Sequence, residues 1–135
     1  MDNIVLDTNI VVSALIGKGN PRRILERVIR GDVRMFVSTP IMYEYRKVLR
    51  RPKFAWYPDF HLKASDILRL LTSIATTVEP AFKFDVCPDS DDNKFLETAV
   101  EAKADYLITG NKKHFPSSIH LGVQIVSPSE YMRLS

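Results

Sequence analysis

Short apolar segments alternate with longer segments of helical periodicity along this chain of 135 residues. The strand candidates are NIVLD, RMFVS, TTVEP, DYLIT and VQIVS, at residues 3–7, 34–38, 76–80, 105–109 and 123–127. Strands that are separated by helices pair in parallel, because the chain crosses back over the sheet between them. The alternation therefore predicts an α/β fold in which helices cover both faces of a mostly parallel sheet, a three-layer α/β/α sandwich.

Local signals mark where several helices begin and end. Asn20 followed by Pro21 predicts a helix N-cap with proline at the first helical position, and Gly31 then ends the helix. The same two signals recur at Thr39–Pro40, and Pro52 stops the helix that follows. Helices are predicted over residues 10–16, 21–30, 40–51, 60–76, 91–104 and 128–132.

Length and composition fit one globular domain over residues 1–135, since 45% of the residues are hydrophobic and 26% are charged. The apolar runs are far shorter than the roughly 18 residues of a membrane span, and the N-terminus lacks the layout of a signal peptide. Cys87 is the only cysteine, which excludes an intrachain disulfide and a cysteine-based metal cage. We therefore expect a soluble cytoplasmic protein that does not associate with membranes.

Asp7 interrupts the apolar run IVLDTNIVV. It falls at the carboxyl end of the first predicted strand, and the ligand crevice of an open parallel sheet lies outside the carboxyl ends of its strands. The alternative is that Asp7 only caps the helix that follows, which is a common role for aspartate.

Two further acids lie on the inward stripes of predicted helices. Glu44 follows Ile41 by three residues and precedes Val48 by four, so it shares their face and points toward the core. A carboxylate there needs a cation, a metal ion or hydrogen-bond donors, and an ion pair with an arginine is the alternative interpretation. Asp92 precedes Phe95 by three residues and lies at a helix N-terminus, where the helix dipole favours an anion.

Polar residues also surround these positions. Asp89 and Asp91 flank Asp92 in PDSDD, and a capping role is the favoured interpretation for Asp89. At the corresponding place after the strand DYLIT, in TGNKKHF, the polar residue is Asn111.

Asp7, Glu44 and Asp92 come from successive strand–helix units and are expected to converge at one end of the sheet. Convergent carboxylates repel each other unless a cation lies between them. Oxygen-only ligands suit Mg²⁺ or Mn²⁺, whereas the three histidines lack the spacing of a zinc site. The five glycines form no phosphate-binding loop either.

Four segments together resemble the PIN-domain family, in the bacterial branch of toxins related to VapC: IVLDTNIVVSAL, VSTPIMYEYRKVLRRPKF, CPDSDDNKFLETAVEAKADYLITGNKKHF and VQIVSPSEYM. The resemblance implies a three-layer α/β/α fold, a Mg²⁺- or Mn²⁺-dependent ribonuclease, a homodimer and inhibition by a cognate antitoxin protein. Asp7, Glu44 and Asp92 match the first, second and third acids of the family.

Asn111 departs from this pattern, because many members of the family have aspartate there. An asparagine offers a carbonyl oxygen without a charge, so the site has one fewer anionic ligand. A second metal ion is then in doubt unless Asp89 or Asp91 substitutes for the missing acid.

In the mechanism that we hypothesise, Asp7 and Asp92 hold the cation, and Glu44 orients or deprotonates a water that attacks an RNA phosphate in line. Side chains expected to hydrogen bond to these carboxylates are Thr8, Asn9, Ser38 and Thr109. For Ser38 and Thr109, capping or ending a strand is the alternative.

Basic residues are candidates for binding RNA. An excess of 19 Lys and Arg over 16 Asp and Glu gives a net charge of +3, and clustering of the acids in one pocket makes the remaining surface more basic. The candidates that we single out are Lys112, Lys113, His114, Arg50 and Arg51; a solvated loop is the alternative for the first three. Phe54, Trp56 and Tyr57 follow the arginines, and we expect this aromatic loop to be exposed and to contact a protein partner.

Three functions remain open at this point. The leading one is a metal-dependent endoribonuclease that cleaves single-stranded RNA and is the toxin of a toxin–antitoxin module. The second is a PIN-like module of weak or absent activity that binds RNA or an antitoxin. A phosphoryl-transfer or receiver domain fits poorly, since the position two residues after Asp7 is Asn9 rather than a second aspartate.

Overall fold

A computed structural model describes residues 1–135. Six strands form one sheet in the order β3-β2-β1-β4-β6-β5. All neighbouring strands are parallel except β5 and β6. The strands are β1 (Asn3–Leu6), β2 (Arg34–Val37), β3 (Thr76–Thr77), β4 (Tyr106–Ile108), β5 (Ile119–His120) and β6 (Val123–Val126). The predicted α/β class with a mostly parallel central sheet is confirmed.

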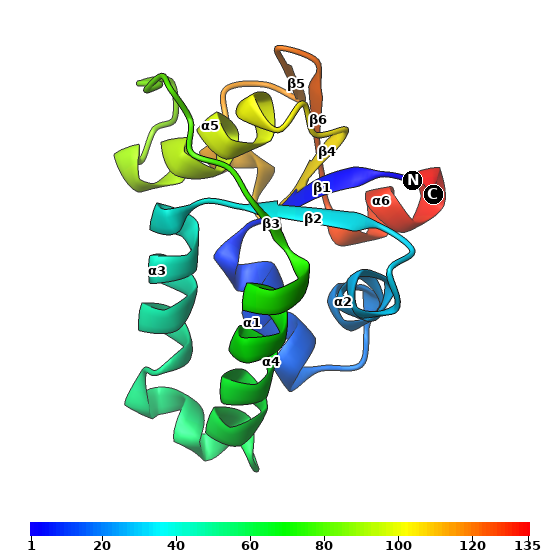
Figure 1. Cartoon of the computed structure of the whole chain (residues 1–135), viewed down its shortest axis with the longest axis vertical. Coiled ribbons are helices and arrows are strands. Elements are labelled where there is room, and N and C mark those ends of the chain that lie inside the picture. The colour runs from blue at the N-terminus through cyan, green and yellow to red at the C-terminus, as the bar shows by residue number, and fades with distance from the viewer.

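Six α-helices surround the sheet. They are α1 (Thr8–Ile16), α2 (Asn20–Arg30), α3 (Thr39–Leu49), α4 (Phe60–Ile74), α5 (Asn93–Glu101) and α6 (Pro128–Leu134), with short 3₁₀ turns η1 (Pro52–Trp56), η2 (Ser90–Asp92) and η3 (Lys112–His114). Figure 1 shows α5 on one face of the sheet and α1, α2 and α4 on the other, which makes the three layers. None of the helices combines the length and the hydropathy needed to cross a membrane.

The strand order reverses between β1 and β4. The chain steps from β1 to β2 to β3 in one direction, and α5 then returns it to β4 on the opposite side of β1. Leu6 pairs with Ile108 at the carboxyl ends of these two strands. This reversal leaves a crevice outside the strand ends, with α3 beside it, and the residues directly after β1 and β4 face that crevice.

The central strands lie in the middle of the core. Ile4, Val5 and Leu6 of β1 and Leu107 and Ile108 of β4 are fully buried, as expected for parallel strands that are covered on both faces. They belong to one continuous cluster of 35 buried hydrophobic residues. The residues that follow β1 and β4 are therefore fixed by the most tightly packed part of the molecule.

The helix ends differ from the prediction in ways that have local causes. The N-cap of α2 is Gly19 rather than Asn20, and Ser38 rather than Thr39 caps α3, with its Oγ accepting a hydrogen bond from the backbone of Ile41. The helix predicted over residues 91–104 is replaced by η2 followed by α5, because the Asp89 side chain accepts a hydrogen bond from the Asp91 amide and tightens the first turn.

Two features were absent from the prediction. The chain leaves α5 at Glu101, and Lys103 then adopts a positive φ of 52°, which ends the helix before residue 104. The two-residue strand β5 forms an antiparallel hairpin with β6, and Leu121 and Gly122 have positive φ angles at its tip. A strand of two residues has too little periodicity to be recognised in the sequence.

Tyr45 joins α3 to the end of β1. Its side chain is fully buried, and its hydroxyl donates a hydrogen bond to the carbonyl oxygen of Leu6, the residue before Asp7. We predict that Tyr45→Phe lowers the free energy of unfolding by about 1–2 kcal/mol, because one buried hydrogen bond is lost. Urea denaturation measures this change. The matched control is Tyr43→Phe, since Tyr43 is 66% exposed and its hydroxyl has no hydrogen-bond partner; equal effects of the two substitutions would contradict the prediction.

Candidate functional site

A pocket of about 670 Å³ lies at the carboxyl ends of the central strands. The start of α1, one side of α3, the turn η2 with the start of α5, and His114 form its walls. It brings together the three acids that the sequence singles out. The lining residues are Asp7, Thr8, Asn9, Thr39, Pro40, Tyr43, Glu44, Lys47, Val48, Arg51, Asp89, Asp91, Asp92, Lys94 and His114.

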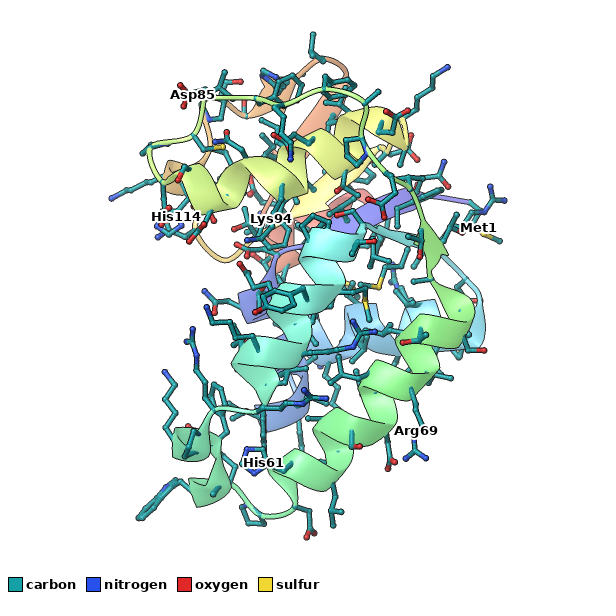
Figure 2. All side chains as sticks on the ribbon, turned by 60° about the vertical axis from the view of Figure 1, so that its left-hand side comes forward. Met1, His61, Arg69, Asp85, Lys94 and His114 are labelled. Atoms are coloured by element: carbon teal, nitrogen blue, oxygen red, sulfur yellow. The ribbon has the colours of Figure 1, made fainter.

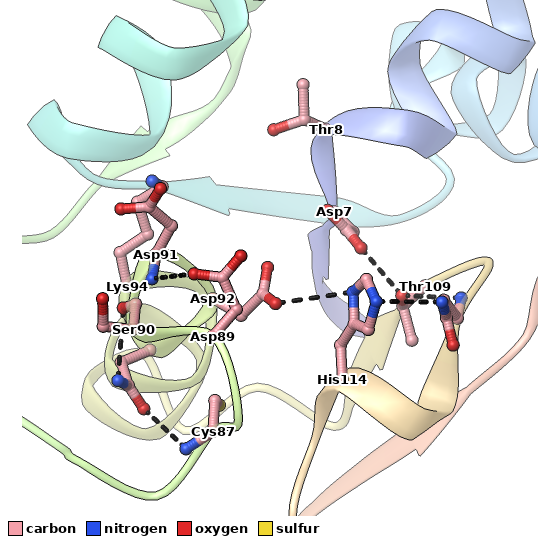
Figure 3. Close-up of polar contacts among 12 residues, drawn as sticks. Asp7, Thr8, Cys87, Asp89, Ser90, Asp91, Asp92, Lys94, Thr109 and His114 are labelled. Carbon is pink, nitrogen blue, oxygen red and sulfur yellow. Dashed lines mark hydrogen bonds and ion pairs between the residues drawn. The ribbon is translucent and has the colours of Figure 1, made fainter.

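Asp7 is held at the floor of the pocket by the end of β4. Its backbone amide donates a hydrogen bond to the carbonyl oxygen of Ile108 at 3.0 Å, and its Oδ2 accepts one from Thr109 Oγ1 at 2.8 Å (Figure 3). Although Asp7 occupies the N-cap position of α1, its side chain makes no capping hydrogen bond. Only 6% of the residue is exposed. Burial raises the pKa of the Asp7 carboxyl, and the negative charge of Glu44 adds to this, while the Thr109 hydrogen bond opposes it.

Glu44 has two partners inside the protein. Lys94 Nζ lies 2.5 Å from its Oε1, and Thr8 Oγ1 donates a hydrogen bond to its Oε2. The alternative interpretation of Glu44 as half of an ion pair therefore describes this structure, with a lysine in place of the arginine. The cluster of acids also differs from the expectation in having a basic side chain among them.

Asp92 has weaker contacts inside the protein than Asp7 or Glu44. Its side chain is 14% exposed, and its Oδ2 is buried without a hydrogen bond. His114 Nδ1 lies 3.4 Å from that oxygen, which is long for a hydrogen bond (Figure 3). Burial and then the charge of Asp7 raise the pKa of Asp92 to about 6, and His114 partly opposes the rise.

Asn111 does not line the pocket. Its side-chain nitrogen lies 2.9 Å from Nε2 of His114, and its backbone amide donates a hydrogen bond to Thr109 Oγ1 at 3.1 Å. An amide nitrogen only donates, so this contact fits the tautomer of His114 with its proton on Nδ1, directed at Asp92. In this structure Asn111 orients His114 and Thr109, which themselves contact the two aspartates.

The remaining acids and hydroxyls divide between the pocket and the fold. Asp89 and Asp91 are exposed on the pocket wall, and Asp89 also caps η2, as the favoured interpretation predicted. Asn9 is exposed in the pocket, whereas Ser38 is buried as the N-cap of α3.

The structure separates the basic candidates. Arg51 lines the pocket, whereas Arg50 lines a groove between α3 and α4. Lys112 forms an ion pair with Glu130 at 2.9 Å, and Lys113 is exposed outside the pocket. His114 lies in the pocket on the same side of the molecule as Lys94 (Figure 2). The five candidates therefore do not form one surface.

The expected exposed aromatic loop is partly wrong. Phe54 is buried and stacks on Phe60, with ring centroids 4.6 Å apart, because the 3₁₀ turn η1 folds it back onto α4. Trp56 and Tyr57 are exposed, by 87% and 39%.

Sequence reasoning missed Tyr43 and Lys94 as lining residues. Tyr43 precedes Lys47 by four residues, a spacing that places both on one side of α3 and that was available as a signal. Lys94 had no such signal, because its partner Glu44 lies on another helix 50 residues away in the sequence.

Two carboxylates of the pocket are suited to binding a hard divalent cation. The buried Oδ2 of Asp92 lacks a hydrogen bond, burial raises the pKa of both the Asp7 and the Asp92 carboxyl, and the charge of Asp7 raises that of Asp92 further, so a cation beside them would stabilise their ionised forms. Mg²⁺ binds through one or two carboxylates together with waters and substrate phosphates. No group of three His, Cys, Asp or Glu side chains is arranged to hold a metal ion.

The family model of the PIN domain matches residues 3–113. An uncharacterized protein of Methanocaldococcus jannaschii is 36% identical over 110 residues, which cover 81% of this chain and 70% of that protein. The chain therefore belongs to the PIN-domain family, as its resemblance to that family predicted.

Solved structures share the fold. VapBC2 of Rickettsia felis bound to a DNA fragment from its promoter has a TM-score of 0.60 at 15% identity, covering 93% of this chain and 98% of that chain. FitAcB of Neisseria gonorrhoeae has a TM-score of 0.57 at 20% identity, with the same two coverages, and FitAB bound to the IR36 DNA fragment has 0.59 at 17%, covering 93% and 94%.

The raised pKa of Asp92 predicts the direction of a pH effect on stability. Below about pH 4 the carboxyl is protonated in both the folded and the unfolded chain, so its burial does not lower the free energy of unfolding. As the pH rises through about 6, the folded protein has to hold a buried carboxylate beside Asp7, whereas the unfolded chain is already ionised, and stability is lost. In metal-free protein, Asp92→Asn should therefore raise the free energy of unfolding by about 1–3 kcal/mol at pH 8 and have almost no effect at pH 4.

Urea denaturation in EDTA at the two pH values tests this. Asp66→Asn is a control on an exposed acid, which pairs with Arg69 at the surface. A destabilising effect of Asp92→Asn at pH 8 would make Asp92 a structural residue instead.

Proposed function

We propose that this protein is a Mg²⁺- or Mn²⁺-dependent endoribonuclease that cleaves single-stranded RNA and acts as the toxin of a toxin–antitoxin module. The observation that carries the proposal is the pair of aspartates, the buried Asp7 and the half-buried Asp92, which face one pocket where the strand order of a PIN-domain chain reverses. Both carboxyls have raised pKa values, so the pocket favours a cation.

Asp7 and Asp92 are the residues that would hold the cation. Thr109 fixes one oxygen of Asp7, which leaves the other oxygen free, and the buried Oδ2 of Asp92 has no competing hydrogen bond. A bound Mg²⁺ or Mn²⁺ supplies an activated water and offsets the negative charge on the phosphoryl oxygens.

Glu44 is the candidate for orienting or deprotonating the attacking water. Thr8 holds its Oε2 and Lys94 pairs with its Oε1, so the carboxylate has a fixed position in the pocket wall. His114 is placed to hold Asp92 in its orientation, since Nδ1 faces Asp92 and Nε2 faces Asn111. Asn9, Asp89 and Asp91 line the same pocket and are further candidates for contacts to the cation or to its waters.

Likeness to toxin–antitoxin complexes supports the biological part of the proposal. Two of the solved structures of similar fold are VapBC2 and FitAB, each bound to a DNA fragment. For this chain we propose a cognate antitoxin protein as partner and a homodimer as the assembly.

A nuclease assay tests the proposal. Purified protein and its Asp7→Asn variant are incubated with a pool of single-stranded RNA in Mg²⁺, Mn²⁺ or EDTA. We predict cleavage that requires a metal ion and that falls by on the order of 100-fold or more in Asp7→Asn, because a buried ligand loses its charge. The control Asp66→Asn changes an exposed acid that does not line the pocket, so this variant should cleave RNA like the wild type.

A weakly active or inactive module that binds RNA or an antitoxin is the second candidate. Two observations favour it: Lys94 already neutralises Glu44, and Asn111 provides no charge to the pocket. Absence of cleavage by the wild type, together with absence of Mn²⁺ binding, would replace the nuclease by this module.

Lys94 provides a second test of the cation site. Its ammonium group repels a divalent cation in the same pocket, so we predict that Lys94→Ala tightens Mn²⁺ binding by about three- to tenfold, measured by calorimetry. The matched control is Lys47→Ala, which removes a pocket lysine that does not contact Glu44 and should have a smaller effect. Weaker Mn²⁺ binding by Lys94→Ala would mean that Lys94 instead holds Glu44 in the position that binding needs.

A further inference from the structure

One side of α3, continued by a residue just beyond its C-terminal end, carries an aromatic side chain and two cations along the pocket wall. Tyr43, Lys47 and Arg51 are spaced by four residues, and all three line the pocket that contains Glu44. Tyr43 and Lys47 lie on the same side of α3, about 6 Å apart along its axis, and Arg51 follows after the helix ends at Leu49. The three residues thus form a row that leads away from the acids, here called the α3 row.

The side chains of the α3 row do not help to hold the fold together. Tyr43 is 66% exposed and has neither a stacking partner nor a hydrogen bond. Lys47 and Arg51 are exposed and form no ion pair. An aromatic side chain that stands free in a pocket and is followed by free cations is not explained by packing.

Figure 2 places the two ends of this row. Lys94 of α5, which pairs with Glu44, lies beside the start of α3, and His61, whose Nε2 is 3.1 Å from the backbone oxygen of Arg51, lies near the other end (Figure 2). The row therefore extends from the acidic pocket to the turn η1.

The chemistry of the row fits a nucleic acid strand. Carboxylates at the floor of the pocket repel phosphate, so a phosphodiester needs cations beside the acids to be held there. Lys94 is neutralised by Glu44, which leaves Lys47 and Arg51 as the free lysine and arginine of the pocket. An exposed tyrosine can stack on a base of a single strand, whereas the bases of a duplex are already stacked on each other.

We propose that the α3 row is the track of a single-stranded RNA, with Tyr43 stacking on the base next to the bond that is cut and Lys47 and Arg51 binding the following phosphates. This inference rests on the proposed function, because it assigns a substrate path to the same pocket. It makes Tyr43 a residue that selects for unpaired bases, and the strand leaves the pocket along α3 toward η1.

Binding without cleavage tests the stacking role. A fluorescently labelled 12-nucleotide single-stranded RNA is titrated with protein in EDTA at low salt, and anisotropy gives the dissociation constant; a gel checks that the RNA stays intact. We expect Tyr43→Ala to weaken binding by about tenfold and Tyr43→Phe to bind like the wild type, since the ring is what stacks. Trp56→Ala removes an aromatic side chain that is more exposed but lines no part of the pocket, and it should have little effect.

The salt dependence tests the cations. Each phosphate contact on a single strand contributes about 0.7 to the slope of log affinity against log salt concentration, so Lys47→Ala and Arg51→Ala should each lower the slope by about 0.7. Arg50→Ala is the matched control, because Arg50 directly precedes Arg51 but lines the groove between α3 and α4 and not the pocket.

The inference is overturned by any of three results. These are wild-type protein that does not bind the RNA at low salt, RNA binding that is unchanged in Tyr43→Ala, or slopes for Lys47→Ala and Arg51→Ala that match Arg50→Ala. Unchanged RNA binding would leave the row as a contact surface for a protein partner. Failure of the proposed function is detected by a separate measurement, the nuclease assay. It would appear as no cleavage in Mg²⁺ or Mn²⁺, or as cleavage that persists in Asp7→Asn.

Discussion

The hydrogen bond from Thr109 to Asp7 joins the ends of the two strands between which the order of the sheet reverses. Both residues directly follow fully buried strand ends, Leu6 and Ile108, so neither can move without disturbing the core. Because the two strand ends are fixed, the Asp7 carboxylate stays buried and largely out of contact with water. Burial in turn raises the pKa of Asp7. The rest of the pocket can be understood as the arrangement of charges around this one fixed group.

Two basic side chains offset those charges in different ways. Lys94 contacts Glu44 directly, whereas His114 stands 3.4 Å from Asp92 and is held on its other side by Asn111. Asp7 has no basic side chain in contact, and the buried oxygen of Asp92 has no hydrogen bond. Glu44 is therefore the acid whose charge is balanced within the protein, while the two aspartates leave an excess of negative charge. The aspartates, whose charge is not balanced, are therefore the acids proposed to hold the cation, whereas Glu44, which Lys94 and Thr8 hold in place, is proposed to orient the water.

The sequence predicted what depends on local signals. Alternating strands and helices predicted the parallel sheet, and the strand end at Asp7 with the inward stripe of Glu44 placed both acids on the pocket that the structure contains. Features that depend on tertiary contacts were not predictable in this way. The pairing of Lys94 with Glu44 joins two helices far apart in the chain, and Phe54 is buried because η1 folds back onto α4. Asn111 was placed with the metal ligands by its position after β4, yet its side chain turns to His114.

Helix α3 connects the fold to the proposed chemistry through its different sides. Tyr45 is buried and fixes the helix to the end of β1, and Glu44 beside it faces the acids. Arg50 faces α4, whereas Lys47 and Arg51 face the pocket. Because the hydrogen bond of Tyr45 reaches the carbonyl of Leu6, which directly precedes Asp7, the position of the whole α3 row is tied to the position of Asp7. A substitution that loosened this contact would displace the acid and the proposed RNA track together, so stability and RNA binding should change in the same direction at this position.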